Sequence, residues 1–231
     1  MNKRKTLRIV LAITLAVVIA AGATLAYLTA RTPTINNVFT FSSNVSGVIE
    51  EPGWDDQVWD QTLNGGNGGF RPRGNPSDQW GRNRATNIVP GREIPKDPNL
   101  VNSGSIAVYG ALRVEFVNGG GGALTAPQLA AVMTNVNIDW NTTAWTLVSG
   151  ARNTASHIVH YNNVIAQNAR GSAPYFTTVT ISPTTSTADM ATLQGIPGGF
   201  NIRINGAVIQ AEGFTNAAAA APQLVTLFTT P

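Results

Sequence analysis

Apolar residues alternate with polar ones in several separate runs along the chain, which is the spacing of half-buried β-strands. The runs lie at residues 36–49, 106–117, 156–165, 175–181 and 200–210. Shorter apolar stretches surround Leu100-Val101, Ile138 to Trp140, and Trp145 to Val148, and the last two suggest a further strand pair. No strand–helix–strand alternation is present. The pattern therefore predicts an all-β fold of roughly seven to nine strands.

Three short segments have helical character instead. Thr125 can cap a helix that has Pro127 in its first turn and Leu129, Val132 and Met133 on one face. Residues 187–193 can form one or two helical turns. The alanine run 217–221 predicts a short surface helix that ends near Pro222. We expect the first of these helices to cover one end of the sheets.

Residues 55–87 are rich in Gly, Asn and Pro, and they predict a long loop inserted into the sandwich. Arg71, Arg73, Arg82 and Arg84 cluster in this loop. We expect a solvated loop, and a local contact site is the alternative.

The N-terminus has the three parts of an export signal. A basic stretch, Met1 to Arg8, precedes an apolar run at 9–19, and small residues follow it. Thr24 and Ala26 suit the −3 and −1 positions of a signal-peptidase site, so cleavage before Tyr27 is predicted. A retained membrane anchor is the alternative, because 9–28 is long enough to span a bilayer.

Charge and cysteine content narrow the function further. Removing the four basic residues of the signal segment from the 15 in the chain leaves 11 against 12 acidic ones, a formal charge of −1. Overall charge then gives no argument for binding nucleic acid or an anionic membrane. The chain has no cysteine, which excludes disulfides, thiolate metal sites and a cysteine nucleophile.

Catalytic chemistry finds little support in the residues. The two histidines, His157 and His160, lie three apart in a strand-like run, and this spacing places them on opposite faces of a strand. Glu50-Glu51 and Asp55-Asp56 are carboxylate pairs in which the residues are adjacent in sequence, and we expect them to face solvent, with Ca²⁺ binding as the alternative. We therefore assign no catalytic residue, no metal ligand and no cofactor.

Four blocks, in order, resemble the TasA/camelysin family of exported proteins. The first joins Gly22-Ala23-Thr24-Leu25-Ala26-Tyr27-Leu28-Thr29 to Asn37-Val38-Phe39-Thr40 and Glu51-Pro52-Gly53-Trp54. The second is Pro90-Gly91, Lys96-Asp97-Pro98 and Asn102-Ser103-Gly104. The third is Pro174 to Ile181, and the fourth is Ala207 to Phe214, which contains Ile209-Gln210 and Gly213-Phe214.

The resemblance implies a jelly-roll-like β-sandwich with a few short helices, over residues 36–231, in a secreted protein of the extracellular matrix or cell surface. It implies a subunit of biofilm-matrix fibres, with further copies of itself and a SipW-type signal peptidase as partners, and membrane contact only before cleavage. It also implies assembly by strand donation, in which the leader 27–35, with Tyr27, Leu28, Thr29 and Ile35, pairs with a neighbour's sheet edge. Pro33 departs from a clean donor strand because it removes one backbone donor.

The remaining motif residues specify the fold in this interpretation. They are Pro90, Gly91, Lys96, Asp97, Pro98, Asn102, Gly104, Ile209, Gln210, Gly213 and Phe214. The resemblance also decides between two interpretations of residues 200–210. Asn205-Gly206 is a hairpin signal, but we expect one continuous strand in which Gly206 permits a close backbone approach.

Two other functions stay open. One is a monomeric surface or spore-envelope binding protein. The other is a metalloendopeptidase, as the camelysin name implies, although the chain has no His-Glu-x-x-His motif.

Overall fold

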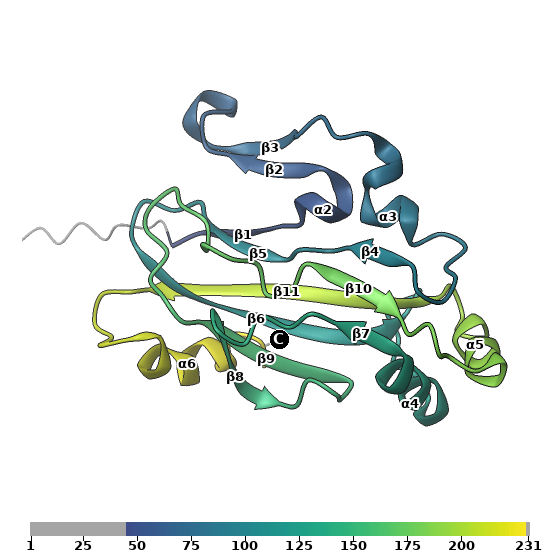
Figure 1. Cartoon of the computed structure of the whole chain (residues 1–231). Coiled ribbons are helices and arrows are strands. Elements are labelled where there is room, and N and C mark those ends of the chain that lie inside the picture. The colour runs from purple at the N-terminus through teal and green to yellow at the C-terminus, as the bar shows by residue number, and fades with distance from the viewer. Residues whose placement is uncertain (1–44, 230–231) are drawn as a thin grey trace, which may run out of the picture. The chain divides into compact units, whose positions relative to one another are not determined.

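The computed structural model describes residues 45–229 and is shown in Figure 1. The predicted signal segment 1–26 and the predicted leader, with Tyr27, Leu28, Thr29 and Ile35, lie outside the described residues. No helix within 45–229 has the length and apolar character needed to cross a bilayer.

Antiparallel strands make up most of the described chain. The largest sheet has four strands in the order β11-β6-β9-β8. They are β11 (Phe200–Gln210), β6 (Val108–Asn118), β9 (Ser156–Tyr161) and β8 (Trp145–Gly150). β11 pairs with β6 along its whole length, from Phe200 opposite Asn118 to Gln210 opposite Val108.

Two smaller sheets form a second layer over this one (Figure 1). One pairs β1 (Gly47–Glu50) with β5 (Asn99–Asn102), and the other has the order β4 (Glu93–Pro95), β10 (Thr178–Ile181), β7 (Val136–Ile138). Backbone hydrogen bonds continue between the two smaller sheets, from Tyr175 N–H to the Pro98 carbonyl at 2.9 Å and from Gly171 N–H to the Leu100 carbonyl at 2.8 Å.

The core lies between the layers, and β6 shows why. Its alternate residues Val108, Leu112, Val114 and Phe116 are buried in the main cluster together with Leu100 and Val179 from the second layer. Period-two alternation of this kind packs one face of a sheet inward. The predicted all-β class with a few short helices is therefore confirmed, and the arrangement is compatible with a β-sandwich.

Helix α6 (Ala217–Thr226) corrects one prediction. The sequence predicted a surface helix that ends near Pro222, but Pro222 lies inside the helix. The buried residues Ala220 and Leu224 pack against Tyr109 and Ile158 on the outer face of the four-stranded sheet. This packing carries the helix through a position at which proline removes a backbone donor.

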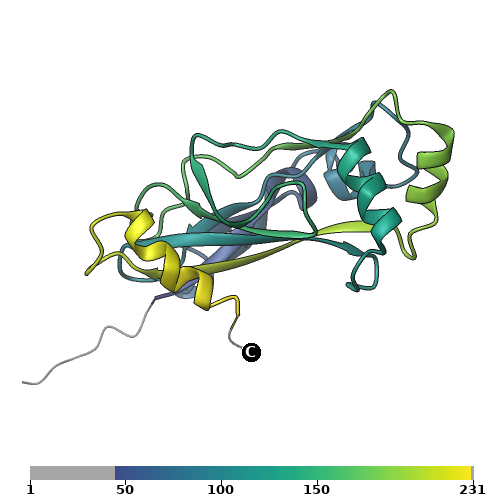
Figure 2. The same cartoon turned by 90° about the horizontal axis from the view of Figure 1, so that it is seen from below.

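Helices α4 (Ala126–Asn135) and α5 (Thr187–Gln194) lie together at the opposite end of the sheets from α6 (Figure 2). Thr125 is the N-cap of α4 and forms a capping box with Gln128. The sequence prediction for both helices is confirmed, as is the position of α4 at one end of the sheets.

The predicted loop at 55–87 is wrong in detail, because the segment folds into short elements. They are α2 (Pro52–Asp55), β2 (Gln57–Asp60), the 3-10 turn η1 (Asn64–Gly66), β3 (Gly69–Pro72), the turn η2 (Ser77–Gln79) and α3 (Gly81–Arg84). Trp59 meets Phe70 edge-to-face across the β2–β3 pair. The expectation that the carboxylate pairs face solvent is wrong for Glu50 and Asp56, which are both buried. The Asp56 carboxylate accepts hydrogen bonds from Gly74 N–H and Asn75 N–H. Side-chain contacts thus order this segment, although its content of Gly, Asn and Pro by itself favours an irregular loop.

The expected pairing of the two strands around Trp140 is also wrong. β7 and β8 both form, but β7 pairs with β10 and β8 pairs with β9, so they belong to different sheets. β8 is the far edge of the four-stranded sheet, and its register with β9 shifts between Leu147 and Ser149. Such a bulge bends an edge strand and interrupts its ladder.

Candidate functional site: the free edge of β11

Among residues 45–229, β11 pairs with β6 along one edge and has no strand partner along the other, which is called its free edge here. Just beyond the last ladder pair, Ala211 N–H donates to the Ala107 carbonyl at 2.9 Å. This bond shows which residues of β11, the odd- or the even-numbered ones, direct their backbone groups towards β6. The odd-numbered residues of β11 therefore bond to β6, because hydrogen-bonded pairs alternate along an antiparallel ladder. The hydrogen bonds on the other side of β6 support this assignment. Phe116 N–H donates to the Ala155 carbonyl next to β9, so the even-numbered residues of β6 bond towards β9 and not towards β11.

The even-numbered residues of β11 accordingly direct their N–H and C=O groups away from β6. These residues are Phe200, Ile202, Ile204, Gly206, Val208 and Gln210. None of their backbone groups has a hydrogen-bond partner among residues 45–229. A row of unpaired groups along an eleven-residue strand is a template for pairing with another strand.

Gly206 explains how β11 stays continuous under the second layer. A Cβ at this position would lie 3.0 Å from Ile49 and 3.0 Å from Leu100. The glycine therefore allows close approach of the layers, as predicted, and the hairpin interpretation of Asn205-Gly206 is wrong.

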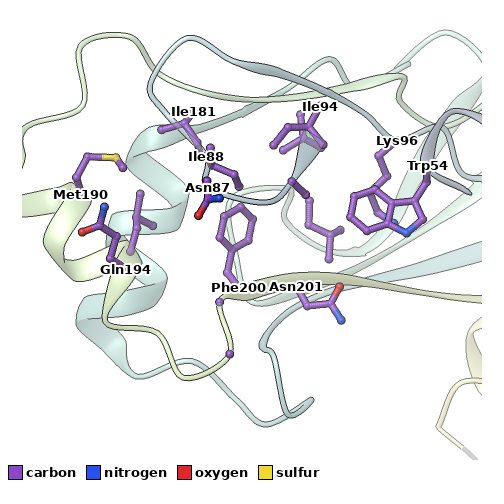
Figure 3. A pocket seen from close by; sticks show the side chains of 16 residues that line it. Trp54, Asn87, Ile88, Ile94, Lys96, Ile181, Met190, Gln194, Phe200 and Asn201 are labelled. Carbon is purple, nitrogen blue, oxygen red and sulfur yellow. The ribbon is translucent and has the colours of Figure 1, made fainter. Parts of the chain in front are cut away.

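The first half of the free edge borders a largely apolar hollow of about 390 Å³ between the layers. Figure 3 shows the Phe200 ring between Met190, from α5, and Trp54, from α2, with Ile88 and Ile94 close by. Phe200 and Ile202, whose backbone groups are unpaired, both line this hollow. A strand added at this edge would therefore have space for an inward-facing side chain.

Two more open hollows follow β11 towards its end. The first, of about 420 Å³, lies on the outer face of the sheet, where Arg113, Glu115, Arg203 and Asn205 line it. The second, of about 520 Å³, is lined by Val45, Val208, Phe214 and Leu227. Val45 and Leu227 are large apolar side chains that are 40% and 51% exposed. The layers meet closely at Gly206, so hollows border the free edge at its two ends, while the hollow beside Glu115 opens on the outer face of the sheet.

Charges on the outer face of β11 are paired rather than free. Glu115 receives Arg203 at 2.9 Å and Asn205 at 3.1 Å, and it also pairs with Arg113. Burial alone would raise the pKa of the Glu115 carboxyl, but the two guanidinium groups outweigh burial and lower it. The carboxylate therefore stays ionised and holds the middle of β11 in place.

A buried ion pair supports the wall of the first hollow. The ammonium of Lys96 lies 2.9 and 2.8 Å from the two carboxylate oxygens of Glu51, and 4.8 Å from the Trp54 ring centroid. Burial raises the pKa of Glu51, although Lys96 opposes this. Asp97 accepts Gly53 N–H at 2.6 Å, and burial raises its pKa to about 6. Lys96 and Asp97 therefore fix α2, which carries Trp54.

The other family-motif residues also have structural positions. Gly91 has φ of +80° and donates to the Ile181 carbonyl at 2.8 Å, in the turn that follows Pro90 and leads to β4. Asn102 is fully buried, and its amide donates to the carbonyls of Ile106, Ile165 and Ala166. The Asn102 side-chain oxygen accepts Gly104 N–H.

The last motif lies at the free edge itself. Ile209 and Gln210 end β11, Gly213 turns the chain with φ of +92°, and Phe214 lines the last hollow. The structure thus brings this motif close to Val45, the first described residue. Sequence reasoning did not predict which edge would be free, because alternation along one strand does not reveal its neighbours.

The histidines do not form a site together. Both lie on β9, three residues apart, and so face opposite sides of the sheet, as predicted. Tyr175 accepts a hydrogen bond from Arg152 at 2.8 Å and lies 3.0 Å from Nε2 of His157, so its hydroxyl donates to that nitrogen. Burial lowers the pKa of His157 to about 4. Within the part of the chain that is described, no three His, Asp or Glu side chains are placed to hold a metal ion.

No protein-family model, curated protein or solved structure matches the chain.

Proposed function

We propose that the protein is a secreted structural subunit that assembles head-to-tail into extracellular fibres of a biofilm matrix. In this proposal a SipW-type peptidase cleaves after Ala26, and the N-terminal segment that begins at Tyr27 completes the sheet of the next copy at β11. The two layers then form a jelly-roll-like sandwich, as the resemblance to the TasA/camelysin family implies. The unpaired backbone of β11 is the observation that carries this proposal.

The energetics of an edge favour such a partner. Six residues of β11 leave both an N–H and a C=O group without a protein partner within 45–229. Each backbone hydrogen bond contributes about 0.5–1.5 kcal/mol net. A donated strand would add several such bonds and bury side chains in the hollows beside them. Because donor and acceptor are different surfaces of one chain, the contact does not close on itself and continues as a filament.

The test compares two substitutions of one residue. Ile204 directs its N–H away from β6, so Ile204→Pro removes a donor from the free edge and leaves the β6 ladder bonds in place. Ile204→Ala loses the same side-chain packing but keeps the N–H, and it is the matched control. We expect electron microscopy of the secreted chains to show filaments for the wild type and Ile204→Ala, and dispersed particles for Ile204→Pro.

Filaments of normal length from Ile204→Pro would show that β11 is not the accepting edge. Dispersed wild-type particles at every concentration would contradict the fibre function. Circular dichroism of each variant checks that the sheets are retained, so that a loss of filaments reports on assembly rather than on folding.

A further inference from the structure

We infer that the part of a second copy that enters the β11 groove is residues 37–43, with Phe39 and Phe41 directed between the layers. This inference rests on the proposed function and assigns the donated strand to residues 37–43 in place of 27–35. The groove is defined here as the free edge of β11 together with the hollow at each of its two ends, beside Phe200 and beside Val208. Its occupant is the N-terminal segment of another copy of the same chain.

The alternation of residues 27–35 does not suit an apolar groove. Residues two apart share a face of a strand. One face of this segment would carry Arg31 and Pro33 inward together with Tyr27, and the other face has Leu28 as its one large apolar side chain. An unpaired arginine that enters an apolar hollow pays a desolvation cost.

Residues 37–43 have the alternation that the groove requires. Phe39 and Phe41 share one face, while Val38, Thr40 and Ser42 lie on the other. No proline interrupts this stretch, so every residue can donate to the ladder. The segment therefore offers two aromatic side chains at adjacent inward positions and a mostly polar outer face.

The first hollow has the size and chemistry for one of these rings. At about 30 Å³ per molecule, its 390 Å³ correspond to roughly a dozen waters. Trp54, Met190 and Phe200 line it, and rings and sulfur favour aromatic contacts. A phenylalanine would displace water from apolar surface, which is the main source of affinity in such a site.

The position of Val45 agrees with this assignment. Val45 is 40% exposed and lies at the far end of the groove, beside Val208. Residues 37–43 thus end two residues before this exposed position of their own chain. Seven extended residues span about 23 Å, which covers most of the free edge of a partner's β11.

The absence of cysteine makes disulfide trapping a direct test. Thr40→Cys, on the outer face of the donated strand, is combined in turn with a cysteine at each outward-facing position of β11. Those positions are Asn201, Arg203, Asn205 and Ala207. Neighbouring strands bring paired residues within disulfide reach. We expect at least one combination to give a ladder of covalent dimers, trimers and longer chains on a non-reducing gel of the full secreted chain.

Ala30→Cys with the same β11 cysteines is the matched control, and it is expected to give no ladder. A ladder from Ala30 but not from Thr40 would overturn the inference and leave the proposed function intact, since the donor would then be 27–35. A disulfide within single chains would show that the segment closes its own groove, which contradicts a second copy as occupant. Filaments without any trapped pair would exclude β11 as the acceptor, and a lack of filaments in the wild type would contradict the proposed function itself.

Phe39→Ala with Phe41→Ala supplies a readout that needs no disulfide. We expect the sedimentable fraction of this variant to fall at least tenfold. Tyr27→Ala with Leu28→Ala, which truncates two apolar side chains of the earlier donor, is expected to sediment like the wild type. The reverse result would assign the groove to residues 27–35.

Discussion

Gly206 shows how one missing side chain shapes the core. Ile49 and Leu100 each have an atom 3.0 Å from the place that its Cβ would take, so the further methyl groups of a β-branched residue would crowd them. We expect Gly206→Val to lower the free energy of unfolding by about 1–3 kcal/mol, the usual cost of overpacking. Urea denaturation measures this change. Gly120→Val is the control, because a Cβ at Gly120 meets only the Asn118 side chain, at 3.4 Å. An equal loss in both variants would contradict the packing argument.

His157 makes the free energy of unfolding depend on pH. Its pKa falls from 6.5 to about 4 in the folded chain, because burial disfavours the imidazolium. The unfolded chain therefore takes up a proton first, and the stabilisation present above pH 6.5 is lost as pH falls towards 4. Between pH 7 and pH 4, we expect the free energy of unfolding of His157→Gln to fall by on the order of 2 kcal/mol less than that of the wild type. Urea denaturation at each pH measures both values.

Asp97 acts in the opposite direction over the same range. Its raised pKa of about 6 means that the folded chain binds a proton before the unfolded chain does, so this carboxyl adds stability as pH falls. This contribution cancels when the wild type is compared with His157→Gln, because both proteins contain Asp97. Parallel curves for the two proteins would show that His157 does not control the acid response.

The helices and strands that could be predicted are those with a clear local sequence signal, such as a helix cap or a regular alternation of apolar and polar residues. The Thr125 cap and the following apolar face predicted α4, and strict alternation predicted β6 and β11. The elements in 55–87 were missed because long-range contacts order them, such as the bond from Gly74 N–H to Asp56 eighteen residues earlier. The predicted pairing of β7 with β8 was wrong because the partner of a strand depends on the layer in which the strand lies.

The candidate site was predictable only in part. The ending from Ala207 to Phe214 was identified as a motif, and it forms the last part of the β11 groove. The position of the free edge had no sequence signal, because alternation along a strand does not show whether a neighbouring strand lies beside it. Lys96 and Asp97 were assigned to fold specification, and their contacts with Glu51 and Gly53 are of that kind.

Helix α5 offers a way to close the first hollow without touching β11. Met190 lines that hollow from α5 and is partly exposed. We expect Met190→Trp to fill the space and lower the sedimentable fraction at least fivefold, because an incoming ring would have no room. Met190→Leu, similar in volume, should behave like the wild type. Normal filaments from Met190→Trp would argue that no side chain enters this hollow.

For the whole molecule, the predicted cleavage has a clear consequence. An uncleaved chain keeps residues 27–44 attached to the apolar run at 9–19, so its donor segment would stay tethered at the membrane. We expect Ala26→Phe, which blocks a small-residue site, to leave the protein cell-associated and without filaments. Mass spectrometry of the secreted wild type should give Tyr27 as the first residue. Filaments from uncleaved Ala26→Phe would contradict the idea that export processing permits assembly.

The two outer strands of the large sheet differ in a way that governs how such a polymer would grow. β11 runs for eleven residues and has no strand partner on one side within 45–229, whereas β8 has six residues and its register with β9 shifts between Leu147 and Ser149. A bulged edge strand pairs poorly with the edge strand of another sheet. Growth would then proceed lengthwise only, yielding thin threads in preference to broad ribbons or amyloid-like plaques.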